Sequence, residues 1–312
     1  MCRQDGGTRA HRDVFRACPD GPVPETAMTT PDQAPTTPLC ATLIDGVPAD
    51  RIPVADRGLQ YGDGLFETIA VVDGTPCLFD RHLARLREGC VRLSIPPPPE
   101  DELAAEALGL SRGVDRAVLK LILTRGEGGR GYRPPDPSRP RRILRLTPWP
   151  AHPDAWRSTG VRVRYCRTRL GHQPLLAGLK HLNRLEQVLA RAEWNDLDIA
   201  EGLMLDLDGR VVEGTQTNLF VLQDGQLLTP ALDRCGVAGV VRGLVLEAAW
   251  VLGFRVVEAA LTPERLAAAD ALFLTSSLAG VWPVRELAGL LVDPEQVPAE
   301  LRAGVLEAAF RP

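Results

Sequence analysis

Lysine is nearly absent from this sequence. Of its 36 basic residues, only Lys120 and Lys180 are lysines, and all the others are arginines. Arginine can supply positive charge at most surface positions, but its guanidinium does not form an imine with an aldehyde. If the chain uses imine chemistry, only two residues can carry it, so the search for a nucleophilic amine narrows before any motif is considered.

Other absences exclude whole classes of protein. No apolar run approaches the roughly 20 residues that are needed to cross a bilayer, and the first residues lack the apolar core of a signal peptide. No basic run stands out, and the formal net charge is −4, which argues against nucleic acid as a partner. We therefore expect a cytoplasmic protein with neither a membrane nor a nucleic-acid partner.

The cysteines indicate neither a metal site nor a disulfide framework. There are seven of them, and none forms a CxxC pair or a Cys/His spacing that is typical of zinc ligands. The five histidines form no metal pattern or catalytic triad either. We expect no metal, and we interpret the cysteines as small buried hydrophobic residues with a few exposed thiols.

The composition is that of an ordinary globular chain. Hydrophobic residues make up 45% and charged residues 24% of the 312 residues, which suits one large domain or two medium ones. Residues 1–38 are rich in Pro, Thr, Gly and Asp, so we expect a disordered tail, with Met28 as a candidate true start. We predict a small N-terminal domain at 39–148, a proline-containing linker at 149–159 and a larger C-terminal domain at 160–312.

Hydrophobic periodicity predicts strands and helices in both halves. Asp45-Gly46 and Asp73-Gly74 indicate hairpin turns. In the first half we predict strands at 41–44, 69–72, 117–124 and 143–146, with helices at 82–93 and 102–110. In the second half we predict a strand at 161–166, a helix at 184–195 with Leu185, Val188, Leu189 and Ala192 on one face, a meander of strands at 202–206, 211–213, 218–222 and 226–228, a helix at 240–252, a strand at 254–258, a helix at 263–268 and a strand at 271–275. This mixture favours two α/β (mixed α+β) domains over one doubly wound sheet.

Of the two lysines, Lys180 is the better candidate nucleophile. It follows Gly178-Leu179 just ahead of a predicted helix, where a ligand can reach it. At such a place the amine can be desolvated enough to act as a nucleophile. The alternative is an ordinary surface lysine near a helix end. Lys120 lies within an apolar strand and, by alternation, on one of its faces, where we favour a solvated or interface role.

Three further segments could bind an anionic or ring-shaped ligand. Glu213 ends a strand before a Gly/Thr-rich turn, where a carboxylate can accept a hydrogen bond from a pyridinium N–H. Gly239 and Val240 stand at a helix start, whose amides can bind phosphate. The loop from Arg125 to Tyr132 is not a Walker motif, because no Gly-Lys-Ser/Thr sequence ends it. Its two arginines nevertheless suit a dianionic ligand. Taken singly, each segment is also explained as a solvated strand end, a tight loop or a basic surface loop.

Taken in order, these segments resemble a known family. The resemblance rests on Asp56–Thr68 (DRGLQYGDGLFET), on His82–Leu86 (HLARL), and on the segments around Lys180, Glu213 and Gly239, and it extends over about residues 40–310. It is to the class IV pyridoxal-phosphate enzymes, which include branched-chain and D-amino-acid aminotransferases and aminodeoxychorismate lyases. The resemblance implies a two-domain class IV aminotransferase-like fold with pyridoxal 5′-phosphate bound between the domains, and a homodimer.

The same resemblance implies a role for individual residues. Lys180 would carry the cofactor covalently, and Glu213 would bind its pyridine nitrogen. Thr68 would lie near the reacting carbon and act with Lys180 in catalysis. The phosphate would be bound by Arg85, by the amides of Val240 and Val241, and by the hydroxyl of Ser277; the substrate would be bound by Arg125, Arg130 and Ser276.

Within the family, three segments resemble the lyase branch: Arg125–Tyr132, Lys180–Gln187 (KHLNRLEQ) and Gly280–Val284 (GVWPV). The implied substrate is 4-amino-4-deoxychorismate, converted to 4-aminobenzoate for folate biosynthesis with pyruvate as co-product. One departure is Ser276, where that branch usually carries Asn. The alternatives are a D-amino-acid or branched-chain amino-acid transaminase of the same fold, which would require a keto acid, and a binding protein that has lost catalysis.

Overall fold

The computed structural model describes residues 40–311, which form two β-sheets with helices packed on them. The tail predicted at 1–38, including Met28, lies outside the described residues. No described helix is both long and apolar enough to cross a membrane. The six-stranded sheet is built from residues 41–148 and the nine-stranded sheet from residues 161–291, so the predicted linker at 149–159 falls between them.

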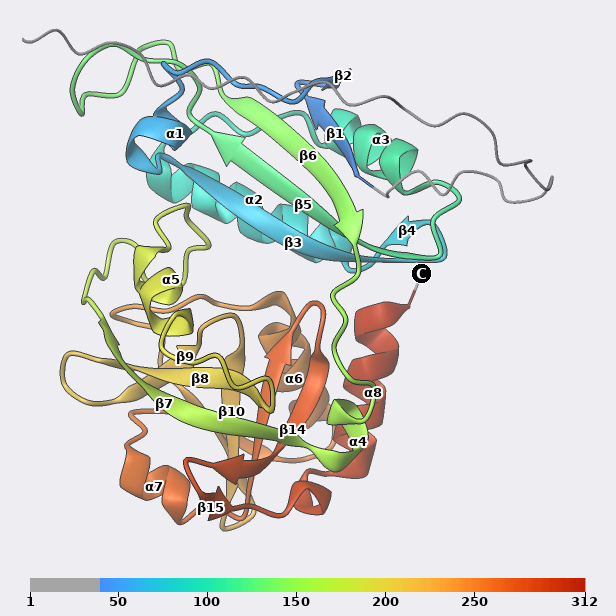
Figure 1. Ribbon diagram of the computed structural model, residues 1–312, viewed down its shortest axis with the longest axis vertical. Helices are drawn as coiled ribbons and strands as arrows, with labels where there is room; N and C mark the ends of the chain where they lie inside the picture. Colours follow the sequence, from blue (N-terminus) through green and yellow to red (C-terminus); the bar gives the residue numbers. More distant parts are fainter. Residues whose placement is uncertain (1–39, 312) are drawn as a thin grey trace, which may run out of the picture. The chain divides into compact units, whose positions relative to one another are not determined.

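The first sheet is antiparallel throughout, in the order β2-β1-β6-β5-β3-β4. Helices α2 and α3 pack on one of its faces, as Figure 1 shows. Both predicted hairpins are confirmed: Asp45-Gly46 and Asp73-Gly74 have positive φ at both turn residues, as two-residue hairpins require. The elements are β1 (Ala41–Ile44), β2 (Val47–Pro48), α1 (Arg57–Tyr61), β3 (Gly64–Val72), β4 (Thr75–Pro76), α2 (Phe79–Leu93), α3 (Glu100–Ser111), β5 (Arg116–Thr124) and β6 (Arg141–Pro148).

Alternation along β3 and β5 separates a core face from a face that is available to ligands. Ile69, Leu119 and Leu121 are fully buried in the core beneath the helices. Successive side chains of a strand point to opposite faces, and Thr68 pairs directly with Lys120 across the two strands. The sheet therefore presents Thr68 and Lys120 on the face opposite to the helix-covered core.

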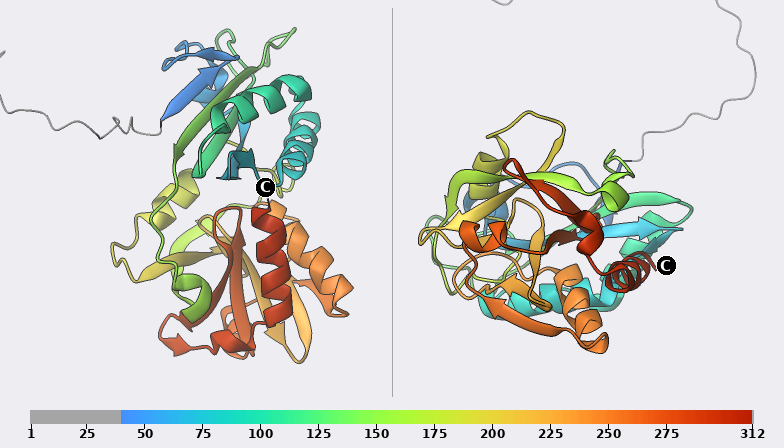
Figure 2. Two further views of the ribbon diagram at one scale, coloured as in Figure 1. Left: turned by 90° about the vertical axis from the view of Figure 1, so that its right-hand side faces the viewer. Right: turned by 90° about the horizontal axis from the view of Figure 1, so that it is seen from below.

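The second sheet mixes parallel and antiparallel pairs in the order β12-β11-β10-β13-β14-β7-β8-β9, with β15 beside β14. Helices α6 and α8 pack against each other and against this sheet, which Figure 2 shows from the side. The elements are α4 (Trp156–Thr159), β7 (Val161–Leu170), α5 (Leu185–Arg191), β8 (Ile199–Asp206), β9 (Val211–Gly214), β10 (Asn218–Gln223), β11 (Gln226–Pro230), α6 (Val240–Val251), β12 (Arg255–Ala259), α7 (Pro263–Ala267), β13 (Ala271–Ser276), β14 (Gly280–Leu287), β15 (Leu290–Leu291), a 3₁₀ turn (Pro294–Gln296) and α8 (Ala299–Phe310).

The predicted meander is wrong at its centre. Strands β8 and β9 form an antiparallel pair, as do β10 and β11, but β10 pairs with β13 instead of β9. Phe220 in β10 and Phe273 in β13 stack with ring centroids 5.0 Å apart, and both are fully buried. Burying this aromatic pair favours the pairing of β10 with β13, because stacked buried rings contribute about 0.5–1.5 kcal/mol beyond the area that they bury.

The helix predicted at 184–195 is shorter, and the environment of its apolar face was not foreseen. Helix α5 spans Leu185–Arg191. Leu185, Val188 and Leu189 are 77%, 60% and 61% exposed, whereas Ala190 is completely buried. The apolar face therefore lies on the surface of this chain.

Candidate active site

A cavity of about 510 Å³ brings together residues from both sheets. Its walls include nine residues that the sequence analysis named as candidates: Thr68, Arg85, Lys180, Glu213, Gly239, Val240, Val241, Ser276 and Ser277. Arg125, Arg130 and Lys120 are not among the lining residues. The catalytic and cofactor-binding candidates thus share one cavity, although their roles stay predictions.

The backbone of Lys180 is bound to both halves of the structure. Its carbonyl oxygen accepts a hydrogen bond from the amide of Phe66 in β3 at 3.0 Å, and the amide of Leu182 donates to Gly64 at 3.0 Å. On the other side, the Gly178 amide donates to the carbonyl of Gly236 at 2.9 Å. Segment 178–182 therefore spans from the edge of the first sheet to the loop that precedes α6, which fixes where the lysine side chain begins.

The amine of Lys180 is held in a desolvated place. Its Nζ lies 4.4 Å from the centroid of the Phe66 ring. Burial, together with the charge of the nearby Arg85 guanidinium, lowers the pKa of Lys180 to about 7, against an opposing effect of Glu67. A substantial fraction of the amine is therefore neutral near pH 7 and can act as a nucleophile or base. Lys120 also lies over Phe66, at 5.1 Å, but it is exposed to solvent.

Glu213 is a buried carboxyl at the end of β9. Its side chain is 4% exposed, and one carboxyl oxygen accepts a hydrogen bond from the amide of Val237 at 2.8 Å. Burial raises the pKa of Glu213 to about 7, while that hydrogen bond and the charges of Arg184 and Lys180 oppose the rise. A buried acid of this kind can hold a protonated ring nitrogen by a charge-assisted hydrogen bond.

Behind Glu213 lies a second buried acid that the sequence reading missed. Glu201 is completely buried in β8 and accepts hydrogen bonds from the hydroxyls of Thr215 (2.6 Å) and Thr217 (3.0 Å) and from the Gln216 amide (3.1 Å). These residues form the turn that lines the cavity next to Glu213. The available signal was an acid directly before the strand predicted at 202–206, since a carboxyl that is buried at such a place needs several donors.

One end of the cavity is suited to an anion. Helix α6 begins at Val240, and the first amides of a helix have no intrahelical acceptor, so they can bind phosphate. Asn218 holds the preceding loop, because its Oδ1 accepts from the Gly239 amide at 3.1 Å and its Nδ2 donates to the Val237 carbonyl at 2.8 Å. Arg85 and Ser277 line the same cavity, as predicted by position.

Arg85 belongs to a buried cluster of charged groups. Its Nε donates to Glu67 at 2.9 Å, its Nη2 also donates to Glu67, and its Nη1 donates to the carbonyl of Ala238 at 2.9 Å. Glu67 also binds Nδ1 of His82 at 2.6 Å, and both side chains are 1% exposed. Glu67 and His82 lie within the segments that carried the family resemblance, but neither was singled out.

Arg125 lies outside the cavity and is bonded within the protein. Its Nε donates to Asp63, and its Nη1 and Nη2 donate to the carbonyls of Ser94 and Leu93, each at 2.8 Å. It is 5% exposed, and these bonds fix the position of the side chain. Arg130 is exposed. A substrate contact for either arginine stays a prediction.

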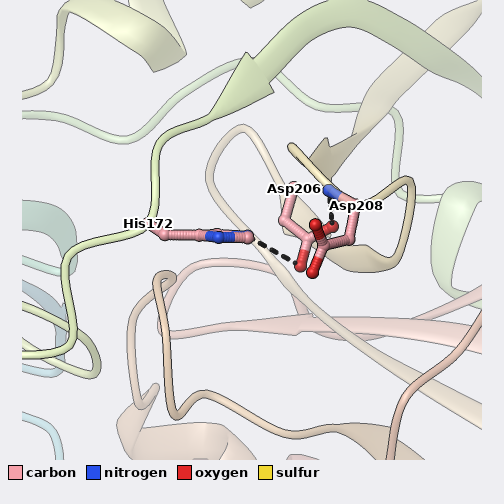
Figure 3. Close-up of side chains that lie close together, drawn as sticks. All are labelled: His172, Asp206 and Asp208. Atoms are coloured by element: carbon pink, nitrogen blue, oxygen red, sulfur yellow. Dashed lines mark hydrogen bonds and ion pairs between the residues drawn. The ribbon is translucent and has the colours of Figure 1, made fainter.

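Among the residues described, His172, Asp206 and Asp208 bring three possible metal-ligand atoms within 4.8 Å of one another. Figure 3 shows His172 directed at Asp206, with Nε2 3.1 Å from a carboxylate oxygen. The other oxygen of Asp206 accepts the amides of Asp208 and Arg210, each at 2.9 Å, and Asp208 pairs with Arg234. The carboxylates are therefore satisfied by a tight turn and a guanidinium, and we assign no metal to them.

The donor set of the cavity fits pyridoxal 5′-phosphate. A lysine amine, a buried carboxyl and a helix N-terminus with an arginine and a serine match an aldehyde, a ring nitrogen and a phosphate. The cavity wall also contains a buried hydroxyl, Thr275 Oγ1, that has no hydrogen-bond partner within residues 40–311. Such an unsatisfied group is expected where a bound ligand completes the hydrogen bonding.

Comparisons with known proteins identify relatives of this chain. The sequence model described as amino-transferase class IV matches residues 64–287. The aminodeoxychorismate lyase of Vibrio harveyi is 39% identical over 241 residues, which are 77% of this chain and 89% of the relative. The crystal structure of 4-amino-4-deoxychorismate lyase from Pseudomonas aeruginosa is 52% identical, with a TM-score of 0.80, over 84% of this chain and 98% of that one. The branched-chain-amino-acid aminotransferase of Salmonella typhimurium is 28% identical over 252 residues, 78% of this chain and 82% of the relative.

Proposed function

Because the chain belongs to the class IV aminotransferase family, we propose that it is a pyridoxal-phosphate enzyme that acts as a 4-amino-4-deoxychorismate lyase. The observation that carries the proposal is the shared cavity, in which Lys180 is the one lysine on the wall and a substantial fraction of its amine is neutral near pH 7. The likeness to two lyases supports the choice of substrate over an amino acid.

Different residues of the cavity would bind the phosphate and the ring of the cofactor. Arg85, the hydroxyl of Ser277 and the amides of Val240 and Val241 would hold the phosphate, and Glu213 would hold the ring nitrogen. When bound, pyridoxal phosphate supplies an aldehyde that captures amines and a ring that withdraws electrons from the neighbouring carbon. Pyridoxal phosphate is therefore the cofactor that we propose.

Lys180 and Thr68 are the residues that we propose to move protons. The neutral Lys180 amine takes the proton from C4 of the substrate ring as a general base. The bond between C3 and the enolpyruvyl oxygen breaks, and a proton from solvent passes through the Thr68 hydroxyl to the leaving oxygen, so that Thr68 is unchanged at the end of the step. Loss of enolpyruvate makes the ring aromatic, so the products are 4-aminobenzoate, a folate precursor, and pyruvate in equal amounts.

Ser276 and Arg130 are the residues that we propose to bind the substrate. Ser276 lies on the cavity wall, and its Oγ accepts a hydrogen bond from the Ala279 amide at 3.1 Å, which leaves its proton free for a substrate oxygen. Arg130 remains a candidate for a substrate carboxylate. Arg125 could bind substrate only by giving up its bonds to Asp63 and to two backbone carbonyls, so we favour Arg130.

A homodimer would explain the surface of α5. Leu185, Val188 and Leu189 form an exposed apolar face, and Val188 also lines the cavity. Apolar side chains that gather on a surface mark interaction sites more often than single ones do. We propose that a second copy covers this face.

The five described cysteines are free thiols, which is in keeping with a reducing, cytoplasmic location.

The proposal is tested by pyruvate release from 4-amino-4-deoxychorismate without any keto acid. The two lysines provide a matched pair of variants. Lys180→Arg should abolish both the visible absorbance of the cofactor and turnover, because a guanidinium forms no imine, whereas Lys120→Arg should keep the absorbance. A Lys180→Arg protein that kept its colour and made 4-aminobenzoate would refute the assignment.

The rival function is transamination, which the likeness to a branched-chain aminotransferase favours. It predicts that the yellow protein releases no pyruvate from 4-amino-4-deoxychorismate and converts amino acids once 2-oxoglutarate is added. The same preparation therefore distinguishes the two activities.

A further inference from the structure

Three side chains from separate parts of the chain form a line that ends at the cavity. Glu67 in β3 binds Nδ1 of His82 in α2 at 2.6 Å, and Nε2 of His82 lies 3.4 Å from the hydroxyl oxygen of Ser277, just after β13. Glu67 and His82 are each 1% exposed, while Ser277 lines the cavity. A buried acid and imidazole thus stand directly behind a hydroxyl on the cavity wall.

The acid determines how the imidazole is protonated. Burial raises the pKa of Glu67, but the charge of Arg85 and the hydrogen bonds from His82 and Arg85 outweigh it and lower the pKa to about 2. An ionised carboxylate can only accept, so Nδ1 of His82 carries a hydrogen. In the neutral ring Nε2 is then an acceptor for the Ser277 hydroxyl, whereas in the protonated ring Nε2 donates to that hydroxyl instead.

The charges around His82 favour the neutral ring when no anion is bound. Burial lowers the pKa of His82, and the cations of Arg85 and Lys180 lower it further, against the opposing effect of Glu67. A phosphate dianion beside Ser277 would place negative charge on the remaining side of the imidazole. Opposite charge nearby favours the protonated form of a histidine.

We propose that His82 takes up a proton when a phosphate group binds at Ser277, so that the Ser277 hydroxyl stops donating to His82 and donates to the phosphate. The proposal rests on the phosphate end described under the proposed function. The proton comes from solvent and is held on Nε2, and no covalent bond of the ligand changes. His82 is therefore a positioning residue: it acts on the phosphate through Ser277.

The test uses two ligands that cannot attach to Lys180, pyridoxine 5′-phosphate and pyridoxine, which differ only by the phosphate. Calorimetric titrations in two buffers of different ionisation enthalpy, near pH 7.5, count the protons taken up on binding. For the wild-type protein we expect up to about one more proton with the phosphate ester than with pyridoxine. His82→Asn keeps an amide at Nδ1 for Glu67 but does not reach Ser277, so the extra proton should be lost. Lys180 faces the same ligands in both proteins, so the difference reports on His82.

Affinity provides a second readout. His82→Asn should bind pyridoxine 5′-phosphate about 10-fold or more weakly, the factor expected for one hydrogen bond to a charged group, and should bind pyridoxine as before. His82→Gln, whose amide reaches the position of Nε2, should recover affinity without the extra proton. Ser277→Ala, which leaves the buried imidazole intact but removes the hydroxyl between His82 and the phosphate, should bind pyridoxine 5′-phosphate more weakly and pyridoxine as before, whereas the control Ser158→Ala, at an exposed serine, should change neither affinity.

Equal proton counts for the two ligands in the wild-type protein would overturn the proposal. So would a His82→Asn protein that loses affinity for both ligands alike, since that is the result of a purely structural role. If the wild-type protein gains no visible absorbance with pyridoxal phosphate, the proposed function itself fails. If it gains that absorbance but shows equal proton counts, the role of His82 alone fails.

Discussion

Replacing Glu213 by glutamine should stabilise the cofactor-free protein, and by an amount that depends on pH. Glu213 has a pKa of about 7 in the folded chain because of burial, against an ordinary value of 4.5. Ionising it in the folded state therefore costs up to about 3 kcal/mol, since one pKa unit corresponds to about 1.4 kcal/mol. The penalty is absent below the unfolded pKa, grows as the pH rises from 4.5 to about 7, and stays constant above it.

Glutamine has nearly the same shape and can still accept the hydrogen bond from the Val237 amide. We expect Glu213→Gln to raise the free energy of unfolding by about 2 to 3 kcal/mol at pH 8 and by about 1 kcal/mol or less at pH 5. Urea unfolding at a fixed protein concentration measures both values, and Glu307→Gln, at an exposed position, is the matched control. Glu213→Gln should at the same time weaken pyridoxal phosphate binding, because the carboxylate no longer pairs with the ring nitrogen.

An equal change at both pH values would refute the reasoning, because a gain that comes from removing a buried charge must vanish where the carboxyl is protonated. A loss of stability at pH 8 would show that Glu213 is held by stronger partners than the Val237 amide and the charges of Lys180 and Arg184.

Two further predictions concern side chains outside the cavity. Arg125→Lys should lower the free energy of unfolding by about 2 kcal/mol, because lysine cannot reproduce three buried hydrogen bonds; loss of turnover without any shift of the urea midpoint would instead favour substrate binding by Arg125. Leu189→Glu should convert the proposed dimer to monomer in sedimentation velocity, because it places a charge in an exposed apolar face; an unchanged sedimentation coefficient would show that α5 is not the interface, and Leu197→Glu, at another exposed leucine, is the control.

Local signals in the sequence were sufficient for the elements that short-range chemistry determines. The hairpins at Asp45-Gly46 and Asp73-Gly74 follow from residues that tolerate positive φ, and the start of α6 after Gly239 is where the helix was predicted. The pairing of β10 with β13 could not be read in this way, because it joins Phe220 to Phe273 across more than fifty residues. Strand β14 was missed because it contains Pro283, which disfavours a strand interior.

In the candidate site, too, some residues could be predicted from local signals in the sequence, and others depend on long-range contacts. Lysine scarcity and the family resemblance led to Lys180 and Glu213, and the structure places both on one cavity wall. The apolar face of α5 was also recognised, but periodicity says which residues share a face and not what covers it. His82 could not be singled out, since its meaning depends on contacts with Glu67, 15 residues away, and Ser277, 195 residues away.

The groups that would hold the cofactor are brought together by the backbone of four residues, 236–239. The carbonyl of Gly236 accepts the amide of Gly178, two residues before Lys180. The Val237 amide donates to Glu213, the Ala238 carbonyl accepts from Arg85, and α6 begins directly after Gly239. Each link uses a main-chain N–H or C=O group, so these bonds do not depend on the side chains of Val237 and Ala238. Gly236 and Gly239 leave no room for a side chain, because an added Cβ would lie 2.8 Å from Leu232 at the first and closer still to Asn218 Oδ1 at the second. Inserting or deleting one residue would shift the lysine, the acid and the phosphate end, because the hydrogen bonds follow the backbone register. The geometry of the candidate site is therefore determined by the length and path of this strip, for which the sequence predicted only a phosphate-binding helix start.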